Sequence, residues 1–199
     1  MATPIAGNPF SDARYTVRRD LFNVWNRKFR ISNAQEQLVL YSEMKAMKLK
    51  EDIRVYADEG KTREVLVIKA RQILDISATY DVWDSQSQTK VGALQRKGLK
   101  SVVRDEWNVL DASDRPVGKI QEDSLVLALL RRFLTNLIPQ SYSVTLNEQE
   151  LAEFKQNFNP FLLKLTLDFS RDPQGQLDRR LGIAAAILLC AIEGRQQQY

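Results

Sequence analysis

The sequence predicts a mainly β (α+β) protein, a closed twelve-stranded antiparallel β-barrel around a central hydrophobic C-terminal helix. Two observations lead to this prediction. A hairpin pattern recurs along most of the chain, and one helix near the C-terminus is apolar on every face. A barrel of that width cannot be filled by its own side chains, since about eight strands is the limit for that. The barrel needs an apolar filling, and the helix needs an apolar enclosure.

The hairpin pattern is clearest in two stretches, "YDVWDSQSQTKVGAL" (80–94) and "WNVLDASDRPVGKI" (107–120). In each, Val follows an aromatic residue by two positions, Asp follows by two more, and a polar turn leads to Val-Gly. Alternating apolar residues place one face of each strand inward, and Asn, Asp, Gly, Ser and Pro favour turns. The pattern predicts a β-hairpin at both places.

Looser versions of the pattern predict three further hairpins, at residues 29–41, 53–68 and 142–154. A first strand at 14–19 and a last strand at 161–169 complete the set of twelve. Short antiparallel strands have exposed edges that can pair with other chains, and closure into a barrel removes those edges. We therefore expect a closed barrel.

The stretch "EDSLVLALLRRFLTNLIPQ" (122–140) interrupts the strand pattern. Ser124 can cap a helix and Pro139 can end it, while apolar residues recur between them at helical spacing. We expect an inserted amphipathic helix at about residues 123–138. Two placements stay open: packing outside the barrel or across its mouth, and a basic helix lying in a membrane interface.

The stretch "LDRRLGIAAAILLCAIEGR" (177–195) predicts the central helix, at about residues 178–193. Asp178 can cap its first amides, and Gly194 lies where a C-terminal cap is expected. The uncharged run 181–192 would rise roughly 18 Å as a helix, against about 30 Å of hydrocarbon in a bilayer. A buried helix is favoured over a membrane segment, and Cys190 is then expected to be an inert, buried thiol.

Composition fits a soluble globular protein, and the length suits one domain or two small ones. The chain has 199 residues, of which 44% are hydrophobic and 27% charged. We expect a flexible N-terminal segment at 1–13, a single barrel domain at 14–195 and a frayed tail at 196–199. One cysteine excludes an intramolecular disulfide and fits a reducing compartment, and the first residues show no secretory signal. We expect a cytoplasmic protein that can lie peripherally at a membrane.

Several classes of enzyme are disfavoured. The chain has no histidine, which removes His-dependent triads and His-based metal sites. It has neither a phosphate-cradling Gly-rich loop nor a GxSxG motif. Neighbouring carboxylates such as Asp105 and Glu106 lie beside predicted strand ends, where they more often serve turns than acid–base chemistry. We expect no enzymatic activity, no cofactor and no metal.

Basic residues are concentrated in three stretches of a chain whose net charge is +4. Convergent Arg and Lys donors suit phosphate groups, and Gly98 suggests a bend that would gather the densest stretch around one loop. The residues of this tentative site for an anionic headgroup are Lys90, Arg96, Lys97, Lys100 and Arg104. The second stretch contributes Arg18, Arg19, Arg27, Lys28 and Arg30, and the third contributes Lys45, Lys48 and Lys50.

Three interpretations of these cations stay open. Outward lysines can simply keep strands soluble and unpaired. Anionic lipid is the favoured ligand among the binding alternatives. Nucleic acid is the least favoured partner, because 25 acidic residues dilute any continuous basic face.

The stretches "EDIRVYADEG", "YDVWDSQSQTKVGALQRK" and "DEWNVLDASDRPVGKIQEDS", with the capped apolar helix, resemble the tubby C-terminal-like superfamily. Its LURP-one-related and phospholipid-scramblase-like branches are most similar, over roughly residues 14–193. The resemblance implies a twelve-stranded barrel threaded by a hydrophobic helix, and surface Lys and Arg that bind phosphoinositide headgroups. It implies a non-catalytic binding or scaffold module whose partners are anionic phospholipid, a membrane surface or a protein.

An alternative implied by the same resemblance is a scramblase-like membrane protein that uses the C-terminal helix as its membrane segment. The chain lacks the Pro-rich N-terminal region and the Cys cluster of scramblases. The resemblance also places an acidic calcium-binding segment before the helix, where this chain has Asp168, Asp172 and Asp178. These residues lack the alternate-residue spacing of a calcium loop, so we expect a polar turn followed by a helix cap.

Overall fold

The computed structural model describes residues 7–20, 26–45, 52–71, 78–97, 106–123, 140–157 and 162–196. They form twelve strands and one helix, α2 (Arg179–Gln196). The strands are β1 (Arg14–Asp20), β2 (Asn26–Asn33), β3 (Leu38–Lys45), β4 (Ile53–Tyr56), β5 (Glu64–Ala70), β6 (Thr79–Asp84), β7 (Lys90–Arg96), β8 (Glu106–Leu110), β9 (Pro116–Glu122), β10 (Ser141–Leu146), β11 (Gln149–Asn157) and β12 (Leu162–Asp168).

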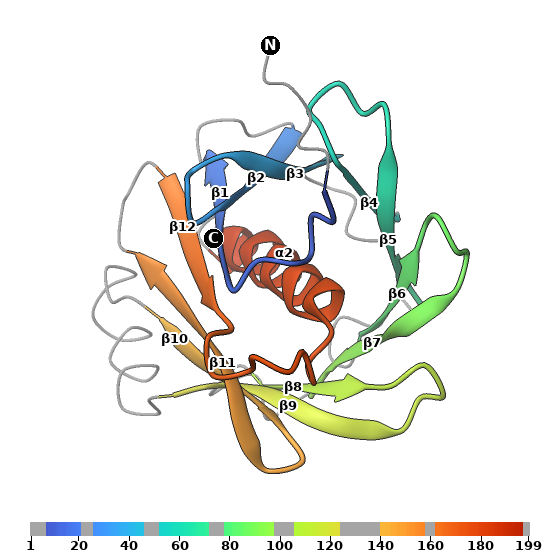
Figure 1. Cartoon of the computed structure of the whole chain (residues 1–199), viewed down its shortest axis with the longest axis vertical. Helices are drawn as coiled ribbons and strands as arrows, with labels where there is room; N and C mark the ends of the chain where they lie inside the picture. The colour runs from blue at the N-terminus through green and yellow to red at the C-terminus, as the bar shows by residue number, and fades with distance from the viewer. Residues whose placement is uncertain are drawn as a thin grey trace.

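The strands close into one barrel in which each pairs with its sequence neighbours and β1 pairs with β12. Every pairing is antiparallel, and α2 passes through the middle of the ring (Figure 1). The predicted fold class is confirmed, and each predicted hairpin corresponds to a pair of neighbouring strands. The predicted inserted helix at about 123–138 falls almost entirely on residues outside those described.

The recurring Asp and Gly of the hairpin pattern have separate structural roles. The Oδ1 atom of Asp84 accepts hydrogen bonds from the amides of Gln86 and Ser87, both at 2.9 Å, and so fixes the β6–β7 turn. The glycine that follows each turn lies against a neighbouring backbone. A Cβ on Gly92 would come within 2.4 Å of the Leu110 oxygen. The pattern therefore reports both turn chemistry and tight strand packing.

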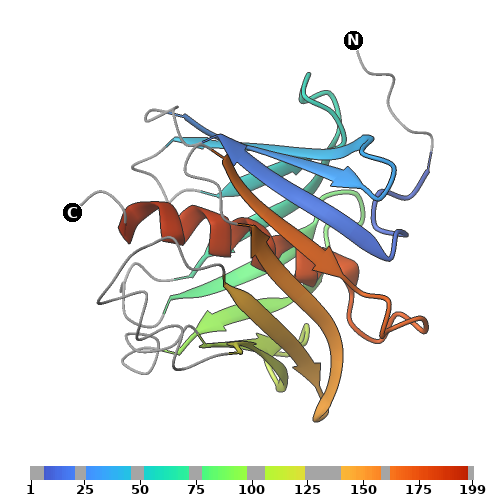
Figure 2. The same cartoon turned by 90° about the vertical axis from the view of Figure 1, so that its left-hand side faces the viewer.

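The two ends of the barrel differ. Short turns join β2 to β3, β4 to β5, β6 to β7, β8 to β9 and β10 to β11, and they lie at the end where α2 begins. We call this the turn end (Figure 2). The connections at the opposite end contain the internal residues that lie outside the description.

The central helix is enclosed by the barrel. Every residue of the run 181–191 is buried, including Ile183, Ile187 and Leu188 at 0% exposure. The prediction of a buried helix is confirmed, and Cys190 within it is buried as expected. If α2 were a membrane segment, the side chains of this run would instead have to be exposed to lipid. Among the described residues no helix combines the length and apolarity needed to cross a bilayer.

Helix α2 begins at the predicted cap and continues beyond its predicted end. The Asp178 carboxylate accepts a 2.9 Å hydrogen bond from the Arg180 amide, so the predicted N-terminal cap is confirmed. The predicted C-terminal cap is wrong, because the helix continues through Gly194 to Gln196. Glycine ends a helix only where it takes a left-handed conformation. Within a helix it is tolerated at a cost of roughly 1 kcal/mol relative to alanine.

The predicted domain boundaries stay a prediction, although part of the N-terminal segment is described. The Asp12 amide donates to the Tyr15 hydroxyl at 2.9 Å, and the Phe10 amide donates to the Asn8 side chain at 3.0 Å. Phe10 also packs against the core. Residues 7–12 therefore lie over the turn end of the barrel.

Candidate functional site

Of the five residues of the tentative headgroup site, Lys90, Arg96 and Lys97 are described, and Lys100 and Arg104 lie outside the described residues. Lys90 begins β7 and Lys97 follows its last residue. At about 3.3 Å a residue, the two lysines lie roughly 23 Å apart along the strand. The strand therefore does not bring them together.

The two lysines already contact carboxylates. The Lys90 ammonium lies 2.6 Å from Asp114 and 3.1 Å from Asp81, and it is only 15% exposed. Lys97 forms an ion pair with Glu106. A phosphate group bound at either lysine would have to replace a carboxylate.

Arg96 ends β7 in register with Trp107 of β8, whose side chain is buried. Leu94, two positions earlier on the same face, is also buried in the core. Because residues two apart share a face of a strand, Arg96 lies on the inner face of the barrel. It does not share the outer surface on which Lys90 meets Asp81.

The second basic stretch divides between the two faces of the wall. Arg19 and Arg27 point inward and are 5% and 2% exposed, next to the core residues Val17 and Phe29. Arg18, Lys28 and Arg30 alternate with them and lie on the outer face. Strand alternation predicts this division, whereas the positive charge of the stretch alone does not distinguish the inward pair from the outward residues.

The inward arginines bind the central helix. Arg19 donates to the Cys190 carbonyl at 2.6 Å, and Arg27 donates to the Ala191 carbonyl. Cations near the C-terminal half of a helix are favourably placed in the field of its dipole. Both side chains therefore attach α2 to β1 and β2 rather than bind an external anion.

Cations face each other across β12, β1 and β2. Arg18 lies directly opposite Lys164 on β12 and opposite Arg30 on β2, with Lys28 two residues before Arg30. We call Lys28, Arg30, Arg18 and Lys164 the basic face. Like charges directly opposite each other on a sheet are destabilising. Elsewhere cations meet acids across strands, as Arg14 meets Asp168.

The carboxylates nearest to the basic face come from turns. Arg18 contacts Glu36 at 3.2 Å, and the Glu36 side chain is 78% exposed. Arg30 forms an ion pair with Glu59. Lys28 lies opposite Glu43 in the register of β2 and β3. Among the described residues, neither Lys28 nor Lys164 has a side-chain hydrogen bond or ion pair. The face therefore keeps cationic groups available to an external anion.

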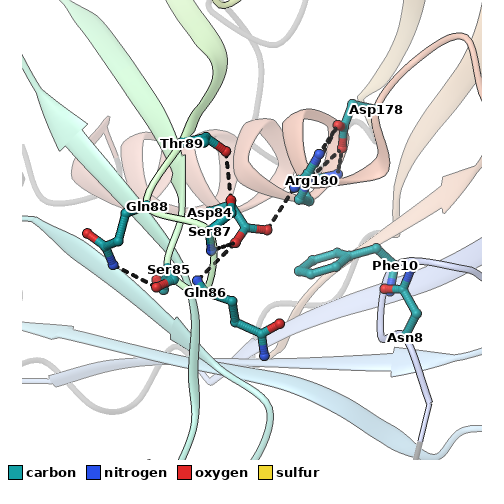
Figure 3. Close-up of polar contacts among 10 residues, drawn as sticks. All are labelled: Asn8, Phe10, Asp84, Ser85, Gln86, Ser87, Gln88, Thr89, Asp178 and Arg180. Carbon is teal, nitrogen blue, oxygen red and sulfur yellow. Dashed lines mark hydrogen bonds and ion pairs between the residues drawn. The ribbon is translucent and has the colours of Figure 1, made fainter.

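A pocket of about 820 Å³ opens at the turn end, beside the start of α2. We call it the mouth pocket. Residues 7–11 form one side, Arg63 and Gln86 extend from two turns, and residues 173–180 form the base. Figure 3 shows part of this site, with Phe10 and Asn8 beside the contact between Arg180 and the β6–β7 turn.

Arg180 joins the start of the helix to the barrel wall. Its guanidinium lies 2.7 Å from Asp84 of β6 and 2.6 Å from Asp178 (Figure 3). Burial acts to raise the pKa of Asp84, but the hydrogen bonds from the Ser87 and Gln86 amides and from Arg180 outweigh it and hold that pKa below its usual value. Asp84 is thus held in its ionised form, and both carboxylates are already paired with Arg180.

The acidic segment before the helix is a polar turn and a cap, as predicted. Asp172 is fully buried and accepts hydrogen bonds from the Gln176 and Leu177 amides and, at 2.6 Å, from Arg179. Burial opposes ionisation of Asp172, yet these donors hold its pKa below the usual range. Asp168 accepts from Ser170 and Arg14. Within the described ranges, no three potential metal ligands come together.

The comparisons with known proteins give one match. A scan against protein families matches the family described as LURP-one-related over residues 38–190. The matched range begins at β3 and ends within α2, and it is more than half of the chain. No curated protein matches the sequence. No solved structure matches it.

Proposed function

Because the chain belongs to the LURP-one-related family of the tubby-like superfamily, we propose that it is a non-catalytic binding module that docks peripherally on anionic phospholipid headgroups. One observation carries the proposal, the direct cross-strand register of Lys164, Arg18 and Arg30. Repulsion between facing cations is relieved when an anion lies over them. A headgroup phosphate supplies that charge.

The chemistry of the basic face suits a lipid surface. Lys28 and Lys164 can offer point charges to phosphate oxygens. Arg18 and Arg30 add positive charge beside them, although each also contacts a turn carboxylate, Glu36 or Glu59. A basic residue near an anionic bilayer contributes about 1 kcal/mol. Lys28 and Lys164 together would then contribute about 2 kcal/mol, or roughly a thirtyfold change in partitioning.

Vesicle flotation tests the proposal. The protein should float with phosphatidylcholine vesicles that contain phosphatidylserine and stay behind with phosphatidylcholine alone, and added salt should weaken the binding. The double variant Lys28→Gln/Lys164→Gln should reduce partitioning roughly thirtyfold. Equal and negligible binding to both kinds of vesicle would exclude headgroup binding.

A charge-matched control separates the basic face from net charge. Lys69 and Lys119 lie on β5 and β9 and are exposed, so Lys69→Gln/Lys119→Gln removes the same charge from other parts of the wall. We expect this variant to partition like the parent protein. A third variant, Lys100→Gln/Arg104→Gln, tests the loop predicted from the sequence. If only the third variant loses binding, the headgroup site lies at that loop instead of the basic face.

A further inference from the structure

The mouth pocket lies apart from the basic face and has the features of a second binding site. Four separate parts of the chain build it: residues 7–11, the β4–β5 turn, the β6–β7 turn, and the connection from β12 into α2. Its volume of about 820 Å³ falls within the range of roughly 300–1,000 Å³ that is usual for small-molecule sites. The basic face, in contrast, lies on the outer wall of β12, β1 and β2.

The base of the pocket is electrostatically satisfied. Arg180 is shared by Asp84 and Asp178, and Arg179 binds the buried Asp172 while its guanidinium lies 4.6 Å from the centre of the Phe169 ring. These contacts occupy the carboxylates of the base. A cationic ligand would therefore find no free carboxylate among the described lining residues.

Arg63 differs from the other charged groups of the pocket. Its side chain is exposed, and among the described residues its guanidinium has no hydrogen bond or ion pair. Other exposed arginines of the wall are paired, such as Arg14 with Asp168 and Arg54 with Glu64. Arg63 also lines a smaller cavity of about 150 Å³, together with Asn33, Val39 and part of the segment 7–12. An unpaired guanidinium bordering two cavities is available to an anion.

Three glutamine side chains give the mouth pocket further polar groups that a ligand can contact. The side chains of Gln86, Gln174 and Gln176 are exposed in the pocket lining, and none has a side-chain hydrogen bond among the described residues. Each amide can donate and accept, which matches hydroxyl groups. Phe10 is the single aromatic residue of the described lining, and it offers an apolar surface to the body of a ligand.

We propose that the mouth pocket binds a small polyhydroxylated anion, with Arg63 holding its phosphate or carboxylate group and the glutamine amides binding its hydroxyls. The fork of a guanidinium matches the oxygens of either group in a bidentate manner. Arg179 and Arg180 are already paired with carboxylates. Arg63 is therefore the group that selects a negatively charged ligand. The ligand class follows from one cation surrounded by neutral donors and acceptors.

Isothermal titration of the full chain with four probes tests this inference. Glucose 6-phosphate and gluconate combine an anion with hydroxyls, glucose lacks the anion, and inorganic phosphate lacks the hydroxyls. We expect the first two to bind more tightly than the last two. Equal affinity for glucose and glucose 6-phosphate, or binding of none of the probes, would overturn the inference.

Substitutions at Arg63 locate the site. Arg63→Gln should weaken binding of glucose 6-phosphate at least about tenfold. The affinity of Arg63→Lys should lie between those of the parent protein and Arg63→Gln, because lysine keeps the charge and loses the forked guanidinium. Lys119→Gln removes the same charge from an exposed strand position outside the pocket and should leave affinity unchanged. Unchanged affinity in Arg63→Gln would overturn the assignment.

Two further measurements separate this site from the proposed membrane function. Lys28→Gln/Lys164→Gln should leave affinity for glucose 6-phosphate unchanged, and Arg63→Gln should leave vesicle flotation unchanged. Loss of flotation in Arg63→Gln, without binding of the soluble probes, would show that the pocket takes a lipid headgroup instead. Failure of flotation alone would remove the membrane proposal and leave the mouth pocket intact.

Discussion

At the scale of single residues, Asp172 and Arg179 form a deeply buried ion pair. Their side chains are 0% and 14% exposed, and the carboxylate also accepts two backbone amides. Pairing of this kind is not strongly stabilising in itself, but removing one partner leaves the other charge buried. The pair therefore fixes the geometry of the connection that leads into α2.

Asp172→Asn should destabilise the protein by about 3 kcal/mol, because Arg179 then keeps its charge in a buried position without a counter-ion. Chemical denaturation measures the change in the free energy of unfolding. Asp168→Asn is the matched control, since the Asp168 side chain is 31% exposed and its partner Arg14 is 60% exposed. The control should lose no more than about 1 kcal/mol. Equal losses in the two variants would contradict this account.

The same carboxylates predict how stability depends on pH. The pKa of Asp172 is lowered in the folded protein, as is that of Asp84. The stabilisation from a carboxylate with a depressed pKa is complete above its unfolded pKa, about 3.9, and is lost as pH falls further. Unfolding measured between neutral and acidic pH should therefore show a steep loss below about pH 4. Asp172→Asn should show a smaller loss over that interval.

At the scale of elements, α2 owes its close packing to small residues. A Cβ on Gly182 would lie 2.6 Å from the Cζ atom of Phe169, so the ring must move to admit even a methyl group. Gly194 lies in the last turns of the same helix. Both glycines thus adopt the helical backbone, and Gly182 lies against the Phe169 ring.

Gly182→Ala should destabilise the protein by roughly 1–3 kcal/mol, because overpacking of the core outweighs the gain in helix propensity. Gly194→Ala should instead stabilise it, by up to about 1 kcal/mol, because alanine favours the helical backbone that Gly194 already adopts. Thermal unfolding of the two variants should shift in opposite directions. Shifts of the same sign would show that the contact with Phe169 is not tight.

The strands could be predicted closely from the sequence, and the candidate binding surfaces could not. Alternation and turn residues are local signals, and they located all twelve strands. The inward direction of Arg19 and Arg27 was also contained in the alternation, but a run of basic residues obscured it. The cross-strand register of Lys164 with Arg18 joins residues far apart in the chain, and no local pattern reports it.

At the scale of the whole molecule, arginines attach the central helix to the barrel wall near both ends of the helix. Arg180 contacts β6 at the turn end, and Arg19 and Arg27 reach the carbonyls of residues 190 and 191. Between them, the buried run 181–191 is enclosed by strands on all sides. The mouth pocket depends on the same arrangement, because it forms only where the turns, residues 7–11 and the start of α2 meet.

The reactivity of Cys190 tests this enclosure most directly, because it is the one cysteine of the chain and lies within α2 at 2% exposure. We expect a water-soluble maleimide to label the native protein far more slowly than the denatured protein, both in solution and on phosphatidylserine vesicles. A lipid-soluble maleimide should label Cys190 of the vesicle-bound native protein just as slowly. Native labelling at the rate of the denatured protein, or rapid labelling by the lipid-soluble reagent, would contradict a helix sheltered inside the barrel.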